Sequence, residues 1–228
     1  MKKLVVLSGA GVSAESGIST FRDSGGLWEG YDILEVASIE GWQKDKELVL
    51  NFYNMRRKNM INSIPNDAHL AIAQLQNNYN TVVITQNVDD LHERAGSKNV
   101  IHLHGELRKS RSTANSELIY NIIGEELNIG DLCELGSQLR PHIVWFGEEV
   151  PLMYNAINEV SKADIILIIG TSMVVYPAAS LIHYANPEIP VYYIDPKIPD
   201  FKFNKNVVHI AEKATVGIKI LTTKYLKV

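Results

Sequence analysis

The feature that most constrains the fold is a series of short, almost purely apolar runs separated by segments with helical spacing. Such runs are typical of strands that are covered on both faces of a parallel sheet. They occur at Leu4–Leu7, Thr81–Thr85, Asn99–Leu103, His142–Phe146, Ala163–Ile169, Val191–Ile194 and Val207–Ile210. The helical patterns lie between them, at Lys44–Ile61, Ala68–Gln76, Leu152–Ser161, Pro177–Tyr184 and Val216–Lys224. This alternation predicts an α/β fold, a Rossmann-like doubly wound parallel sheet.

Two segments, residues 31–62 and 107–140, break the alternation. We expect them to form a smaller discontinuous module beside a main domain made of residues 1–30, 63–106 and 141–228. A chain of 228 residues is long enough for one large domain that carries a small one.

The charge and the apolar segments exclude several classes of partner. A net charge of −4 gives no basic face for a nucleic acid. The longest apolar run, Ile165–Ile169, is far shorter than the roughly 18 residues that span a membrane. The apolar stretch after Lys3 is also shorter than the ~7–15 residues of a secretion signal. We therefore expect a cytoplasmic protein without nucleic-acid or membrane partners.

A glycine-rich turn, Gly9-Ala10-Gly11-Val12-Ser13-Ala14, follows the first strand. It fits the G-x-G-x-x-A pattern, in which glycines let backbone N–H groups approach a pyrophosphate at a helix N-terminus. Such triplets also occur in purely structural turns. An ordinary dinucleotide-binding fold would continue with a second strand, whereas the polar segment Ile18–Trp28 favours a loop that covers a cofactor.

Polar groups are concentrated where two further strands end. Gln86, Asn87 and Asp89 follow one strand, and His102 and His104 end another. Polar groups buried in such places cost free energy unless they are hydrogen-bonded, so the pattern points to a ligand site. Alternatively, Asn and Asp there cap the following helix. The two histidines leave the same face of a strand, and their spacing does not decide which one is catalytic.

Together these motifs resemble the sirtuins, which are NAD-dependent protein deacylases. The resemblance rests on the glycine turn with its continuation Ser16-Gly17-Ile18, on the Thr85–His92 stretch, and on His104-Gly105. It implies NAD as co-substrate, acyl-lysine proteins or peptides as partners, and nicotinamide and O-acyl-ADP-ribose as products. It also selects His104, directly before glycine, as the general base, with Asn87 as a second catalytic residue. Neutral imidazole suits a base that works near pH 7.

The resemblance implies a set of cofactor contacts along the chain. These are Gly9, Ala10, Gly11, Ser13, Ala14, Glu15, Thr20, Phe21, Arg22, Trp28, Gln86, Asn87, Asp89, His104, Gly170, Thr171, Ser172, Asp195 and Ala214. Asp195 departs from the family, where asparagine is common. Its carboxylate could accept from ribose hydroxyls, or Asp195-Pro196 could be an ordinary turn after a strand.

Two further segments resemble the walls of the family's peptide groove. They provide Val144, Phe146, Gly147, Glu148 and Val175 as substrate contacts, and an extended peptide would add between them as a strand. Tyr53 and Arg56 lie at i and i+3 on one helical face, where together they could bind a carboxylate. Sirtuins that remove succinyl or malonyl groups carry such a pair. The alternative is a solvated basic face with Tyr53 half-packed.

Cys133 is the only cysteine, so the chain can form neither an internal disulfide nor a cysteine zinc site. Most sirtuins carry two Cys-x-x-Cys pairs in this region, and we expect no bound metal here. We expect apolar side chains to replace the zinc with a small core, namely Leu118, Ile119, Ile122, Ile123, Leu127, Ile129 and Leu132.

Two other functions compete with the deacylase. An NAD-consuming ADP-ribosyltransferase or NAD hydrolase would use the same cofactor site without needing the Tyr53/Arg56 pair. A non-catalytic NAD-sensing module would not need the full set of Gln86, Asn87, Asp89 and His104. The sequence predicts no particular oligomeric state.

Overall fold

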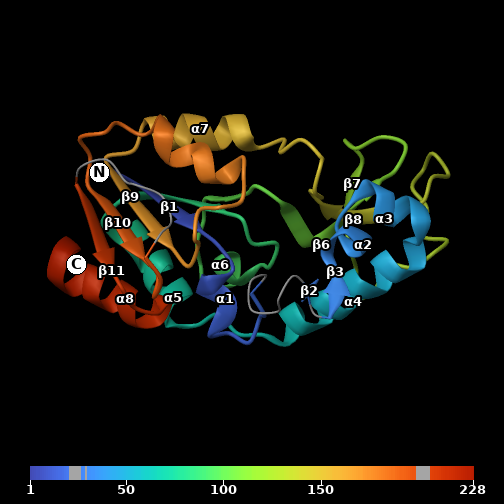
Figure 1. Cartoon of the computed structure of the whole chain (residues 1–228), viewed down its shortest axis with the longest axis horizontal. Coiled ribbons are helices and arrows are strands. Elements are labelled where there is room, and N and C mark those ends of the chain that lie inside the picture. The colour runs from blue at the N-terminus through green and yellow to red at the C-terminus, as the bar shows by residue number, and fades with distance from the viewer. Residues whose placement is uncertain (21–26, 29, 199–205) are drawn as a thin grey trace.

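A six-stranded parallel sheet forms the centre of the larger part of the molecule (Figure 1). The computed structural model describes residues 1–20, 27–28, 30–198 and 206–228. In sheet order the strands are β11 (Val207–Ile210), β10 (Val191–Ile194), β9 (Ile165–Ile169), β1 (Lys3–Ser8), β4 (Asn80–Thr85) and β5 (Val100–His102). The chain leaves β1 for β4 on one side and later returns to β9 on the other. The carboxyl end of β1 is therefore the switch point, where ligands bind in open α/β sheets.

Helices cover both faces of this sheet, because side chains alternate between the faces along each strand (Figure 1). Val5 and Leu7 pack with α7 (Met153–Ser161) and with the 3₁₀ helix Ala178–Tyr184. Leu4 and Val6 pack on the other face with α5 (Asp67–Gln74) and α8 (Ala214–Ile220). The predicted doubly wound α/β fold is confirmed.

A second, smaller part contains an antiparallel sheet in the order β7-β6-β8. Its strands are β6 (Gly105–Ser112), β7 (Ile119–Asn121) and β8 (Leu139–Ile143). Helices α2 (Ile33–Val36), α3 (Ile39–Lys44) and α4 (Lys46–Asn62) pack beside it, after the short strand pair β2 (Leu27–Trp28) and β3 (Tyr31–Asp32). A separate apolar core built around Trp42, Phe52, Tyr53 and Trp145 holds this part together.

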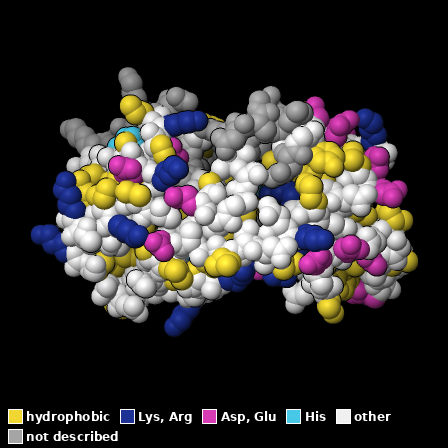
Figure 2. Space-filling view, turned by 90° about the horizontal axis from the view of Figure 1, so that it is seen from below, with side chains coloured by type: hydrophobic (Ala, Val, Ile, Leu, Met, Phe, Trp, Pro, Cys, Tyr) yellow, Lys and Arg dark blue, Asp and Glu magenta, His cyan; other side chains and the backbone are white. Residues whose placement is uncertain are grey.

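The remaining elements are short. Helices α1 (Gly11–Ala14) and α6 (Leu91–Arg94) each follow a strand of the large sheet. A 3₁₀ turn at Leu75–Asn77 extends α5, and a π-helical segment at Leu221–Leu226 extends α8. None of the helices in the described part of the chain is long and apolar enough to cross a membrane. On the face seen in Figure 2, lysine and arginine side chains are interspersed with aspartate and glutamate.

The expected apolar core in place of zinc is wrong. Ile123 is 97 % exposed, and Ile119, Ile129 and Leu132 are also exposed, so that among the seven expected residues only Leu127 is fully buried. Polar contacts hold this region instead. The side chain of Gln138 accepts from Gly130 N and donates to the backbone oxygens of Asn128, Asp131 and Leu139.

A buried arginine on α4 ties the same region to the rest of the smaller part. Arg57 is fully buried and donates to the backbone oxygens of Leu107 and Glu125, and also to the side chain of Asn54. Asn54 in turn exchanges hydrogen bonds with the backbone of Leu127. Hydrogen bonds to backbone groups therefore stabilise this region, for which we had expected apolar packing.

Candidate active site

A cleft of about 740 Å³ opens at the carboxyl ends of β1, β4 and β9 and reaches the smaller part. Gly9, Gln86 and Gly170 line it from the large sheet, and Tyr53 and Trp145 from the smaller part. Every predicted site residue that the structure describes lines this cleft. The predicted contacts Phe21 and Arg22 lie outside the described residues.

The glycine turn forms the floor of the cleft by packing against the loop after β9. A Cβ on Gly9 would lie 2.6 Å from Cβ of Thr171, and a Cβ on Gly11 would lie 2.8 Å from Cα of Gly170. The N–H of Gly11 donates to the oxygen of Gly170 at 2.8 Å. The glycines are thus required by the close approach of two loops, in addition to the space they leave for a ligand.

Ser13 joins the polar residues beneath this floor. Nε2 of His69 lies 3.4 Å from Oγ of Ser13, and Nδ1 of the same ring lies within hydrogen-bond distance of both the backbone nitrogen and Oδ1 of Asn66. Nδ2 of Asn87 donates to Oγ of Ser13, at 3.1 Å. Ser13 then donates its own proton to Asp89, at 3.0 Å. Asn87 and Asp89 are consequently held by one continuous chain of hydrogen bonds.

Burial shifts the pKa values within this network towards the neutral forms. It raises the pKa of the Asp89 carboxyl, although the N–H of Leu91 and the hydroxyl of Ser13 both bond to it. It lowers the pKa of His69 to about 4, so this imidazole is neutral near pH 7. The predicted alternative, a capping role, applies in part, because Asp89 accepts from Leu91 N at the start of α6.

His104 presents one ring nitrogen to the cleft. Its Nδ1 lies 3.1 Å from the backbone oxygen of Gln86, which can only accept, so Nδ1 carries the proton and Nε2 keeps its lone pair. Burial lowers the pKa of His104, and the ring is neutral at pH 7. The arrangement can therefore take a proton from a hydroxyl group in the cleft.

The far end of the cleft carries Asp195. Its side chain accepts from the backbone N–H of Lys197, as in an ordinary turn, and it also lines the cleft. Both alternatives considered for Asp195 are thus compatible with its position. Glu15 accepts from the backbone N–H and the hydroxyl of Thr215 at the start of α8, which ties the glycine turn to that helix.

The opposite wall contains the predicted peptide contacts. The predicted strand His142–Phe146 is partly wrong, because β8 ends at Ile143 and Phe146 lies beyond it, 46 % exposed. Glu148 accepts from the guanidinium groups of Arg140 and Arg111 and from the N–H of Trp145. These contacts give Glu148 a structural role in the wall.

Several residues that line the cleft were not predicted from the sequence. Ile18 belongs to the same glycine-rich stretch, so its place in that motif could have identified it as a cleft residue. Lys197 and Lys213 line the end near Asp195, and no sequence pattern marks them. His69 and Asn66 act from beneath the floor, where only the fold brings His69 to Ser13 and Asn66 to Ser16.

The residues of the cleft fit a dinucleotide, with a floor of small residues, buried amide and hydroxyl groups, and a neutral imidazole. The sequence pattern of the Sir2 family matches residues 9–177. The chain belongs to the Sir2 family. It is 53% identical over 227 residues to an NAD-dependent protein deacylase of Helicobacter pylori strain J99, covering 100% of this chain and 97% of that protein. It is 52% identical over 226 residues to an NAD-dependent protein deacylase of Bacteroides thetaiotaomicron, covering 97% of each.

Solved structures of Sir2 homologues share the same fold. One in complex with NAD has a TM-score of 0.87 at 42% identity, covering 97% of this chain and 88% of that one. A mutant Sir2 homologue in complex with ADP-ribose has a TM-score of 0.88 at 41% identity, covering 97% and 91%. Among the described residues of this Sir2 protein, no three His, Cys, Asp or Glu side chains are grouped so as to hold a metal ion.

Proposed function

We propose that this Sir2 protein is an NAD-dependent protein-lysine deacylase that prefers succinyl- or malonyl-lysine to acetyl-lysine. Family membership and relatives at about half identity over the whole chain support the reaction class. The products would be free lysine, nicotinamide and O-acyl-ADP-ribose, with NAD supplying the ADP-ribosyl group that receives the acyl chain. His104 would act as the general base, because its Nε2 is unprotonated and faces the cleft.

The preference for acidic acyl groups rests on Tyr53 and Arg56. Tyr53 is fully buried, and its hydroxyl accepts from Nε1 of Trp145 at 3.0 Å. The phenolic proton is still available to a ligand oxygen, because the hydroxyl uses only its acceptor capacity in that bond. Burial raises the pKa of Tyr53 to about 12, so the group keeps its proton at neutral pH. This arrangement favours a carboxylate contact over the solvated basic face.

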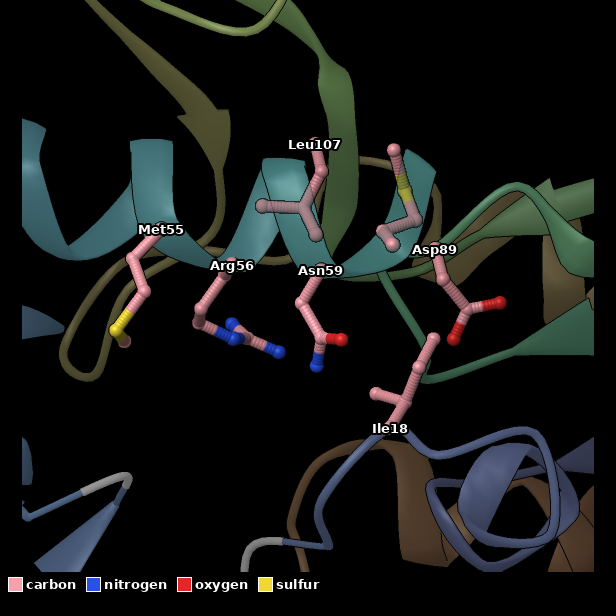
Figure 3. A pocket seen from close by; sticks show the side chains of 7 residues that line it. Ile18, Met55, Arg56, Asn59, Asp89 and Leu107 are labelled. Atoms are coloured by element: carbon pink, nitrogen blue, oxygen red, sulfur yellow. The ribbon is translucent and has the colours of Figure 1, made fainter. Parts of the chain in front are cut away.

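Arg56 is fixed by stacking. Its guanidinium carbon lies 3.8 Å from the centre of the Trp28 ring, a distance typical of cation–π contact. Figure 3 shows Arg56 and Asn59 pointing from α4 into a side pocket of about 230 Å³, with Ile18 and Asp89 nearby. Ile18, Arg56 and Asp89 line both this pocket and the main cleft, so an acyl chain entering from the cleft would meet the guanidinium.

The test compares acetyl- and succinyl-lysine peptides of one sequence, incubated with the enzyme with and without NAD and followed by mass spectrometry. We expect NAD-dependent removal of succinyl to be faster than that of acetyl. Arg56→Met should lower kcat/KM for the succinyl peptide about 10- to 100-fold, because a charge-assisted hydrogen bond is lost, and leave the acetyl peptide nearly unaffected.

Lys58→Met is the matched control, since it removes the same charge from an exposed position two residues further along α4. Faster removal of acetyl by the wild type would discard the preference and keep the deacylase. NAD consumed while both peptides stay intact would instead favour an ADP-ribosyltransferase or NAD hydrolase.

A further inference from the structure

His102, two residues before His104, is hydrogen-bonded at both ring nitrogens. Nδ1 lies 3.0 Å from the backbone oxygen of Asn87, and Nε2 lies 2.7 Å from Oε1 of Glu93 on α6. The Glu93 side chain is 40 % exposed and therefore partly in contact with water. A carbonyl and a carboxylate both accept only, so each ring nitrogen of His102 carries a proton. This geometry describes an imidazolium ion.

The two histidines hold successive carbonyls of one loop. His104 bonds to the oxygen of Gln86 and His102 to that of Asn87. This loop, residues 86–89, supplies Gln86, Asn87 and Asp89 to the cleft. A shift of the Asn87 backbone would therefore move two groups. One is the side-chain amide of Asn87, which bonds to Ser13, and the other is the neighbouring Gln86 carbonyl, which bonds to His104.

The charges around the two rings differ. Glu93 from α6 and Glu106 from β6 favour protonation of His102, and the Asp89 carboxylate also interacts with it. The nearby His92 is kept neutral by burial, which lowers its pKa well below the ordinary value. Burial disfavours the charged form of His102, but the hydrogen bond with Glu93 and its charge outweigh burial and raise the pKa. For His104, burial outweighs the hydrogen bond to the Gln86 carbonyl and lowers the pKa.

We propose that His102 and Glu93 form a positioning pair, in which the imidazolium of His102 anchors the Asn87 carbonyl and holds the cofactor-contacting loop in place. The two histidines then differ in protonation state, since His102 is charged and His104 is neutral. The effect on turnover rests on the deacylase activity proposed above, whereas the protonation state of His102 does not.

Nuclear magnetic resonance tests the protonation state directly, without activity. In protein labelled with ¹⁵N at histidine, both ring nitrogens of His102 should show protonated shifts at pH 7. The Nε2 of His104 should show the shift of a lone-pair nitrogen, and His104→Gln and His102→Gln assign the two signals. A neutral His102 ring at pH 7 would overturn the proposal. An inactive wild type would contradict the deacylase and leave this measurement valid.

The pH profile of kcat/KM tests the pair in turnover. In Glu93→Gln the alkaline limb, where His102 loses its proton, should move to lower pH by about one unit or more, since a close opposite charge is removed. The acid limb, set by His104, should stay. Glu106→Gln is the matched control, because it removes an equal charge near His102 without breaking the Nε2 bond, and its shift should be smaller. An unmoved alkaline limb in Glu93→Gln would refute the pair.

Two amide substitutions separate the two bonds of His102. His102→Asn keeps a donor near the place of Nδ1 and should retain about half or more of kcat. His102→Gln keeps a donor near Nε2 only, and should lose on the order of 10- to 100-fold in kcat, as misplaced reacting groups do. Calorimetric binding of ADP-ribose and urea unfolding check that both variants are folded. Equal losses in the two variants would show that the Asn87 contact has no special role.

Discussion

Burial without a charged partner distinguishes His104 from His102. His102 ends β5, and His104 follows two residues later. Both rings donate through Nδ1 to a carbonyl, but within the described part of the chain only His102 meets a carboxylate through Nε2. Environments that push two neighbouring pKa values apart are typical of acid and base assignments in active sites. The proposed role of His104 as the base is therefore supported by its surroundings as well as by the family pattern.

His104→Ala should reduce deacylation about 10²- to 10⁴-fold, because it removes the general base, while binding of ADP-ribose measured by calorimetry largely survives. His183→Ala, at an exposed position of the 3₁₀ helix, is the control and should change neither property. Because burial lowers the pKa of His104, wild-type activity should persist as the pH falls to 6.5 and be lost only below it. Near wild-type turnover by His104→Ala would refute the assignment.

At the scale of elements, the sequence was informative where strands are apolar and uninformative where they are not. The strands of the large sheet could be predicted because both of their faces are buried, as in β9, in which all five residues are buried. Strands β6 and β7 were missed, because Glu106, Arg108 and Lys109 interrupt any apolar pattern in β6. Pairing with β8, which depends on the fold, makes this segment a strand.

The wall beside β8 depends on the Glu148 carboxylate. Burial opposes its ionisation, but the hydrogen bonds from Arg140 and Trp145 outweigh burial and lower its pKa. Glu148→Gln should lower the free energy of unfolding by roughly 1–3 kcal/mol at pH 7, less than for a fully buried pair because Glu148 is half-buried. A lowered pKa stabilises the protein above the unfolded-state value of 4.5, and this contribution is lost as the pH falls through the folded-state pKa.

Urea unfolding of the wild type and of Glu148→Gln at pH 7 and near pH ~3 checks this prediction, and the two curves should converge at the lower pH. Glu149→Gln, at the next and exposed position, should match the wild type at both pH values. A difference between wild type and Glu148→Gln that is equal at both pH values would contradict the ion-pair explanation.

For the whole molecule, the sequence motifs predicted the cleft better than the architecture around it. The predicted contacts follow from local motifs and from their resemblance to the sirtuins, and those that the structure describes meet in one cleft because the strand ends converge at the switch point. The support from His69 and the exposure of Ile123 could not be predicted, since each depends on the packing of distant segments. The assignment of residues 31–62 and 107–140 to one module stays a prediction.

The intact protein should be stable without a metal, because Gln138 and Arg57 already tie the region where most sirtuins bind zinc. Elemental analysis of the purified protein is expected to find no stoichiometric zinc, and a chelator should leave the Tm unchanged. Gln138→Ala should then lower the Tm, since four backbone groups, that of Leu139 partly buried, lose their partner. One zinc per chain would contradict this expectation.

The tight floor of the cleft also limits how the enzyme can be redesigned. Gly9, Gly11 and Gly170 lie so close that a single added methyl group at any of them meets neighbouring atoms within 2.8 Å. A library that randomises these positions to accept altered dinucleotides would consist mostly of misfolded variants. Diversity is better placed at Asp195, Lys197 and Lys213, which line the same cleft at its other end.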